Sequence, residues 1–312
     1  MDKATGFTTR SILTIPLVGH DADLVGVLQL LNKRSGTFGG EDVGVATALG
    51  ASCALAIQRM RLLEDLVEKN RMERELEVAR QIQTRVLPTS MPALAGYDVA
   101  GWSRAADQTG GDIFDVIGVG NGAILLLGDA TGHGVGPALS VTQVRAMLRI
   151  AVRLGASLDD TFVHINDQLS DDLSSNRFVT GFLGVLDTHA HTIVYHAGGQ
   201  GPILHFRAAT GEASLDGATA LPLGMMPSMG PPKARSAGLE AGDVFALITD
   251  GIFEYENHAG EPFGEERVVA TIRKAASASA AEILRRIVDA VESFAAGAPQ
   301  NDDMTLVIVK RL

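Results

Sequence analysis

Four stretches of the sequence place aspartate beside glycine or beside an apolar run, and no other feature suggests chemistry so directly. They contain Asp112 in GGDIFDV, Asp129 in LLLGDATGHG, Asp250 in ALITDG, and Asp302 with Asp303 in NDDMTLVIV. Any one of them is explained by a turn, because Asp, Asn and Gly are common turn residues at strand ends. Taken together, they could instead lie along one rim of a sheet or sandwich.

Carboxylates that converge on one rim repel one another and are costly to remove from water unless cations neutralise them. Oxygen ligands without cysteine partners suit Mg²⁺ or Mn²⁺. Two such ions are a common device for hydrolysing phosphate esters. Gly110 and Gly111 would let the backbone turn sharply, and Gly132 and Gly134 would leave room around Asp129. A set of unrelated turns is the alternative interpretation.

The composition of the 312-residue chain is typical of a soluble globular protein of about two domains, with 46% apolar and 20% charged residues. A net charge of −11 disfavours binding to nucleic acid or to an anionic membrane. We expect no membrane span, because no run approaches ~20 apolar residues. The start of the sequence does not resemble a secretory signal. Cys53 is the only cysteine, which excludes disulfides within the chain. These features predict a cytoplasmic protein.

The apolar patterns predict an α+β protein in which groups of strands and helices, rather than regular βαβ units, follow one another. This order favours antiparallel sheets with helices on the outside. The predicted strands are 11–18, 23–31, 97–103, 113–119, 122–128, 178–186, 192–196, 202–206, 243–249 and 304–310. The predicted helices are 135–153, 157–173, 264–276 and 280–296, and Ser157 and Ser279 have the spacing of N-caps.

A further helix, much longer than those of ordinary globular domains, is predicted from about Glu41 to Leu87, where Pro88 ends it. Its length indicates a connector. A narrow apolar seam in its second half has the spacing of a short coiled coil, and a helix that lies on its own domain explains the seam equally well. The seam consists of Met72, Leu76, Ala79, Ile82 and Val86.

Residues 89–312 resemble the PPM-type, metal-dependent serine/threonine phosphatases, and among them the bacterial SpoIIE/RsbU-like branch. The matching motifs occur in the family's order and are GGDIFDV, GDATGHGVGPAL, ALPLG, ITDGIFEYENHAGEPFG and NDDMTLVIV. The resemblance implies an αββα sandwich, in which helices flank two mostly antiparallel sheets. It also implies two Mn²⁺ or Mg²⁺ ions and a nucleophilic water that they activate.

The resemblance also assigns roles to individual residues. Asp129 would bridge the two ions, and the carbonyl of Ala130 would face one of them. Asp112 would bind through the shared water network, while Asp250 and Asp302 would complete the shell of the second ion. Supporting positions around these ligands would be Gly111, Asp115, His133, Gly251 and Asp303.

The sequence departs from the family pattern at two places. YHAGGQG has His196 and Gly199 where the family more often has Asn and His, and SRAADQTGG lacks the proline that often follows the arginine. Arg104 is accordingly interpreted as a surface residue rather than a phosphate ligand. The paired histidines of THAHT, His189 and His191, are interpreted as a solvated turn rather than a zinc site.

Residues 1–60 resemble the second half of a GAF sensor domain, through the strand that ends near Pro16, the GVLQLLNK strand and the helix start at Phe38–Glu41. The predicted organisation is therefore a partial GAF-like domain (1–60), a helical linker (61–88) and a phosphatase domain (89–312). We expect the first part to serve as a dimerisation platform, with a possible homodimer through it and the linker, rather than to bind a small ligand.

The favoured hypothesis is a phosphoprotein phosphatase of bacterial signalling, and the resemblance implies an anti-anti-sigma (STAS) protein as its substrate. The alternative is a catalytically silent module that binds a phosphoprotein or mediates dimerisation, although all four acidic positions are filled. Nucleotide hydrolysis is disfavoured, because the sequence has no GxxxxGK[ST] phosphate loop.

Overall fold

The computed structural model describes residues 8–19, 23–132, 134–174 and 176–312. The chain divides between Glu75 and Leu76 into two units, so the boundary falls inside the predicted linker. The helix α2 (Gly40–Val86) continues through this boundary without a break and confirms the predicted long helix.

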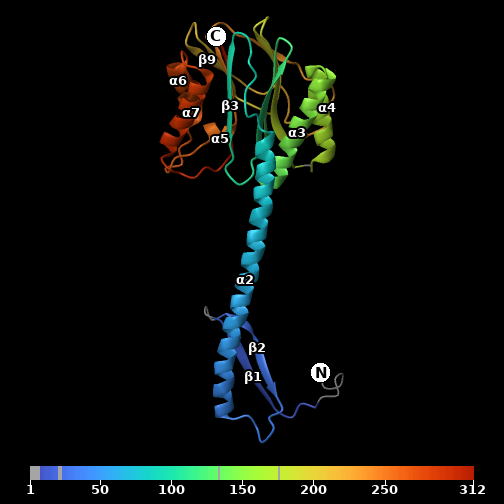
Figure 1. The fold of residues 1–312 in the computed structure, drawn as a ribbon, viewed down its shortest axis with the longest axis vertical. Coiled ribbons are helices and arrows are strands. Elements are labelled where there is room, and N and C mark those ends of the chain that lie inside the picture. The colour runs from blue at the N-terminus through green and yellow to red at the C-terminus, as the bar shows by residue number, and fades with distance from the viewer. Residues whose placement is uncertain (1–7, 20–22, 133, 175) are drawn as a thin grey trace. The chain divides into compact units, whose positions relative to one another are not determined.

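Two five-stranded antiparallel sheets form the centre of the second unit (Figure 1). The first has the order β10-β7-β6-β5-β4 and consists of β4 (Asp112–Val119), β5 (Gly122–Ala130), β6 (Val179–Asp187), β7 (Thr192–Gly198) and β10 (Arg235–Gly238). The second has the order β3-β12-β11-β8-β9 and consists of β3 (Tyr97–Arg104), β8 (Ile203–Arg207), β9 (Glu212–Asp216), β11 (Val244–Ile248) and β12 (Met304–Arg311).

Helices cover the outer face of each sheet. α3 (Val135–Leu154) and α4 (Leu158–Asp172) pack on the first sheet, and α6 (Gly264–Ala275) and α7 (Ala280–Ala295) pack on the second (Figure 1). A single helical turn, α5 (Asp250–Phe253), follows β11. The result is the expected αββα sandwich, and the predicted α+β class is confirmed.

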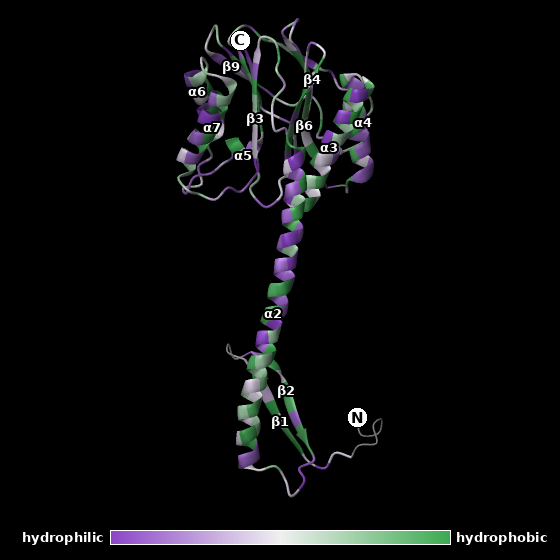
Figure 2. Cartoon of the chain, in the orientation of Figure 1, coloured by the Kyte–Doolittle hydropathy of each residue, from purple (hydrophilic) through white to green (hydrophobic). Residues whose placement is uncertain are grey.

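Three apolar cores hold these four layers together. Phe182, Tyr195 and Phe245 pack between the two sheets, where ring centroids are 5.0–6.0 Å apart. A second core lies beneath α3 and α4, and a third beneath α6 and α7. The central strands are therefore buried on both faces, which is why they appear in the sequence as continuous apolar runs. The outer helices α4 and α7, in contrast, carry many hydrophilic residues (Figure 2).

The helix caps confirm the sequence signals, since Ser157 accepts a hydrogen bond from the N–H of Asp160 and Ser279 accepts one from that of Glu282. The THAHT stretch forms the turn between β6 and β7, as expected. Two strands, β9 and β10, were not predicted. Both are short edge strands with polar sequences, EASLD and RSAG, which lack the pattern of a buried strand.

The first unit contains a hairpin of β1 (Ile12–Val18) and β2 (Leu24–Leu31) and the beginning of α2. Ile15 and Leu17 of the hairpin are buried, as are Ala46 and Ala54 of the helix. Within the described residues, α2 is the one helix whose length and composition would allow it to cross a membrane, and this is weak evidence for a span. The sequence had predicted none.

Candidate active site

Each sheet brings acidic residues to the ends of two neighbouring strands. Asp112 begins β4 and lies directly opposite Asp129 of β5. Asp250 begins α5 immediately after β11, and Asp302 with Asp303 precedes β12, the neighbour of β11. We call these five residues the acidic group.

The carboxylates of Asp112 and Asp129 are the most strongly perturbed of the group. Asp112 is only 4% exposed, and the hydroxyl of Thr249 donates to its Oδ2 at 2.9 Å. Burial, followed by the negative charge of Asp129, raises the pKa of Asp112 well above its usual value. Burial also raises the pKa of Asp129, to about 7, and the charges of Asp250, Asp302 and Asp303 contribute to that rise. The acids are thus close enough to repel one another.

Asp250 and Asp303 also hold their protons more tightly than isolated aspartates. Desolvation is the main cause in both, and Asp302 adds repulsion to each, so both pKa values are raised. Asp303 is 9% exposed and accepts hydrogen bonds from the N–H groups of Ala106, at 2.7 Å, and Gly111. Asp303 therefore fixes the loop before Asp112.

Two glycines are required by close backbone contacts at the site. A Cβ atom on Gly111 would lie 2.8 Å from the carbonyl oxygen of Ala130, and the N–H of Ala130 donates to the carbonyl of Gly111 at 3.0 Å. A Cβ atom on Gly251 would lie 2.0 Å from the carbonyl oxygen of Asp303. Any side chain at either position would push apart the segments that carry the acids.

A cavity of about 350 Å³ opens beside the acidic group. Its lining includes Asp129, Asp250, Asp302, the backbone of Ala130 and Thr180. Within the described ranges, no three Asp, Glu, His or Cys side chains are arranged as a metal site by themselves. The donors are nevertheless oxygen atoms only, and they carry negative charge whose mutual repulsion a divalent cation would relieve. The residues thus fit Mg²⁺ or Mn²⁺, with carbonyls and waters as further ligands.

The structure does not bring Asp115 to the acidic group. Asp115 is fully buried on the opposite face of β4 from Asp112, beneath α3. There Arg149 donates to both of its carboxylate oxygens, at 2.7 and 3.0 Å, and Nε of Arg145 lies 2.8 Å from Oδ2. Asp115 therefore joins a strand to a helix. His133, the other predicted supporting side chain, lies outside the described residues.

The residues that depart from the family pattern are engaged elsewhere. His196 is buried in β7, where Nε2 lies 2.6 Å from Oδ1 of Asp159 and the ring packs on Phe162. The guanidinium of Arg104 donates to Glu292 at 2.6 Å and to Gln300 at 2.9 Å, as befits a surface arginine.

Sequence reasoning missed the neutral groups that support the acids. Thr249 binds Asp112, and Thr180 donates to Gln200, whose own amide donates to the carbonyl of Ile248 in β11. Gln200 lies within AGGQG, a stretch that was compared with the family pattern but in which Gln200 itself was not singled out. Thr249 was visible as the residue before Asp250, although nothing in the sequence linked it to a position 137 residues away.

The fold is that of a PP2C-type phosphatase domain, as comparison with known proteins shows. The SiaA-PP2C domain of Pseudomonas aeruginosa matches 78% of this chain and 98% of its own length, with a TM-score of 0.65 and 21% identity. The family model described as Stage II sporulation protein E (SpoIIE) matches residues 120–312. The chain belongs to the SpoIIE family.

Two curated relatives extend the match beyond that region. Protein IcfG of Synechocystis is 26% identical over 265 residues, which cover 76% of this chain and 41% of IcfG. The phosphoserine phosphatase RsbU of Bacillus subtilis is 22% identical over 261 residues, which cover 82% of this chain and 75% of RsbU. The chain thus spans less than half the length of IcfG and three quarters of RsbU.

Proposed function

We propose that the chain is a protein serine/threonine phosphatase whose acidic group holds two Mn²⁺ or Mg²⁺ ions. The observation that carries this proposal is the convergence of Asp112, Asp129, Asp250 and Asp302 from two sheets, with raised pKa values for the first three. Repulsion among buried acids lowers the stability of the fold, and bound cations would compensate for this loss by neutralising the negative charge.

In this proposal the chain's own residues arrange the reaction. Asp129 and the carbonyl of Ala130 line the cavity that would receive the phosphoryl group, together with Asp250 and Asp302. Asp112 stays buried and is oriented by the hydroxyl of Thr249. The ions, when bound, would lower the pKa of water and neutralise charge on phosphate. Among the residues that the structure describes, no serine or cysteine lines this cavity, which is consistent with direct attack by water.

The proposed substrate is a phosphoserine or phosphothreonine of an anti-anti-sigma (STAS) protein in a partner-switching pathway. The resemblance to the RsbU-like branch supports this choice, as does the relative that is described as a phosphoserine phosphatase. The alternative, a silent module that binds a phosphoprotein, has less support, because every acidic position is filled and the cavity is open to solvent.

Phosphate release from a phosphoserine peptide tests the proposal with the native chain and with Asp250→Asn. We expect release with Mn²⁺, none with chelator, and a loss of at least about 100-fold in the variant, since even partners outside the ligand shell typically cost 10–100-fold. Asp289→Asn is the matched control, because Asp289 lies on α7 and pairs only with Arg285. Activity that persists in chelator, or in Asp250→Asn, would refute the two-ion proposal.

We also propose that the first unit, the GAF-like fragment with the beginning of α2, forms a homodimer in the cytoplasm. Many of its large apolar side chains are exposed and would gain from a partner. They include Leu24, Val27, Val45, Leu55 and Val67, which are 53–68% exposed.

Sedimentation equilibrium of the full chain checks this proposal. We expect twice the monomer mass of 32.7 kDa at micromolar concentration. Leu55→Glu together with Val67→Glu should shift the mass towards the monomer without loss of helicity. A native chain that stays monomeric, or one that sediments only with lipid vesicles, would contradict the soluble homodimer.

A further inference from the structure

One side chain of α2 pairs with both backbone groups of a glycine next to the acidic group. Nε2 of Gln83 donates to the carbonyl oxygen of Gly110 at 2.5 Å, and Oε1 of Gln83 accepts from the N–H of Gly110 at 3.0 Å. Both residues belong to the second unit. The amide thus takes the place of a neighbouring strand at the point where β4 has not yet begun.

This pairing satisfies groups that water reaches poorly. Gly110 and Gly111 are both buried, and Gln83 is half-buried. The folded protein becomes less stable when a buried N–H or C=O group loses its hydrogen-bond partner. Removal of the Gln83 amide would therefore favour another backbone arrangement of Gly110, which as a glycine has many available.

The Gly110–Gly111 pair is held from three directions, and Asp112 follows it directly. Gln83 holds Gly110 from α2, Asp303 accepts from the N–H of Gly111, and the N–H of Ala130 donates to the carbonyl of Gly111. Of these partners, Asp303 belongs to the acidic group and Ala130 directly follows Asp129. Gln83 is the only one of the three that lies outside the sequence motifs that carry the family resemblance.

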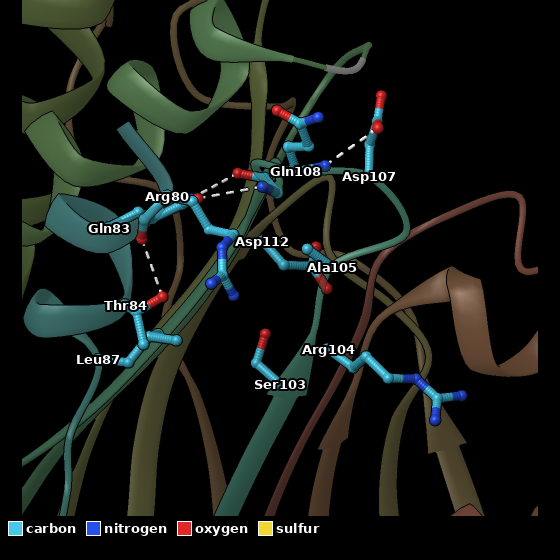
Figure 3. A pocket seen from close by; sticks show the side chains of 11 residues that line it. Arg80, Gln83, Thr84, Leu87, Ser103, Arg104, Ala105, Asp107, Gln108 and Asp112 are labelled. Carbon is cyan, nitrogen blue, oxygen red and sulfur yellow. Dashed lines mark hydrogen bonds between the residues drawn. The ribbon is translucent and has the colours of Figure 1, made fainter. Parts of the chain in front are cut away.

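A second cavity, of about 320 Å³, lies beside this contact and reaches Asp112 (Figure 3). Arg80, Gln83 and Thr84 of α2 line one side of it, and Ser103 and Asp112 line another. The cavity thus lies between the end of α2 and residues of β3 and β4. The position of Asp112 therefore depends on a contact that is next to free volume rather than enclosed by a packed core.

We propose that Gln83 is a positioning residue that sets the affinity of the acidic group for divalent cations. Its amide fixes the backbone of Gly110, and the backbone of Gly110 in turn sets the position and direction of the Asp112 side chain. This inference rests on the proposed function, because it assumes that the acidic group binds Mn²⁺ or Mg²⁺. It extends that function to a residue of α2 that touches neither cation nor substrate.

The test compares Gln83→Met with Gln81→Met in the full chain. Methionine keeps the length of the side chain and a high helix propensity but cannot form the two hydrogen bonds. Gln81 lies in the same turn of α2, is exposed and donates only to Glu77. We expect the Mn²⁺ dissociation constant, from titration calorimetry, to rise about 10-fold or more in Gln83→Met only, as for supporting partners of metal ligands. The kcat at saturating Mn²⁺ should stay near that of the native chain.

Hydrogen–deuterium exchange of the peptide that contains Gly110 and Gly111 gives a readout independent of activity. We expect exchange about 10-fold faster in Gln83→Met, because the N–H of Gly110 loses its acceptor, and unchanged in Gln81→Met. Equal Mn²⁺ affinity and equal exchange in both variants would refute the positioning role, even if native activity is normal. A native chain that binds Mn²⁺ but releases no phosphate would refute the proposed phosphatase and leave the role of Gln83 supported by the affinity difference.

Discussion

The Asp129→Asn variant is expected to lose activity and gain stability at the same time. Within the described part of the chain no side chain pairs with the carboxylate of Asp129, and its pKa is raised to about 7 by burial and by Asp250, Asp302 and Asp303. Asparagine removes that repulsion without changing the size of the side chain. Metal-dependent phosphate release should fall by at least about 100-fold, while the metal-free variant should unfold at higher denaturant concentration than the native chain at pH 8.

Asp115→Asn is the matched control, because this variant is expected to lose stability where Asp129→Asn gains it. Asp115 is fully buried, whereas Asp129 is half-buried, and Asp115 is paired with Arg145 and Arg149. Removal of one partner from a buried ion pair typically costs about 3–5 kcal/mol. Urea unfolding followed by the fluorescence of Trp102, the only tryptophan, reports on the second unit for all three proteins. Destabilisation by Asp129→Asn at pH 8 would contradict the prediction that repulsion between Asp129 and the other acids lowers the stability of the metal-free protein.

The metal-free protein is expected to be less stable at pH 8 than at pH 5, contrary to the usual behaviour of aspartates in ion pairs. The folded pKa of Asp129, about 7, lies above the ordinary value of 3.8. Between these two values the folded state binds more protons than the unfolded state, so the free energy of unfolding falls as pH rises. The full loss from Asp129 alone would be about 4 kcal/mol at most, at 1.36 kcal/mol per pKa unit. Burial raises the pKa of Asp112 in the same direction.

Thermal unfolding in chelator and in Mn²⁺, from pH 5 to pH 8, measures this effect. Ions that bind the ionised acids should offset much of this loss, because saturation at 100 times the dissociation constant adds about 2.7 kcal/mol at high pH. The difference in Tm between the two conditions should therefore widen as pH rises. A difference that is independent of pH would mean that the acids which titrate are not those that bind the ion.

The sequence predicted the antiparallel sheets with outer helices, and the acids at the strand ends, for one physical reason. Strands buried on both faces must be apolar along their whole length, so the acids at their ends are conspicuous in the sequence. The same reasoning failed for Asp115. Side chains alternate between the two faces of a strand, and Asp115 follows Asp112 by three residues, so the two side chains must lie on opposite faces of β4. The roles of the acids as ligands remain predictions.

The remaining features of the site depend on tertiary contacts that have no local sequence pattern. Gln83 binds a backbone 27 residues away, and Thr249 binds a carboxylate 137 residues away. Glutamine and threonine are common in helices and strands, so neither residue type indicates its partner. β9 and β10 were missed for a related reason, since an edge strand gains its structure from the neighbour it pairs with.

The position of β12 determines when the site can exist during synthesis of the chain. β12 lies between β3 and β11, and its partner Arg104 precedes Met304 by 200 residues in sequence. Until β12 has left the ribosome, these two strands have no common neighbour and the acids Asp302 and Asp303 are missing from the rim. Pairing over such a separation is slow, and open strand edges invite wrong partners in the meantime. A nascent chain should therefore be inactive and dependent on chaperones until β12 has been made.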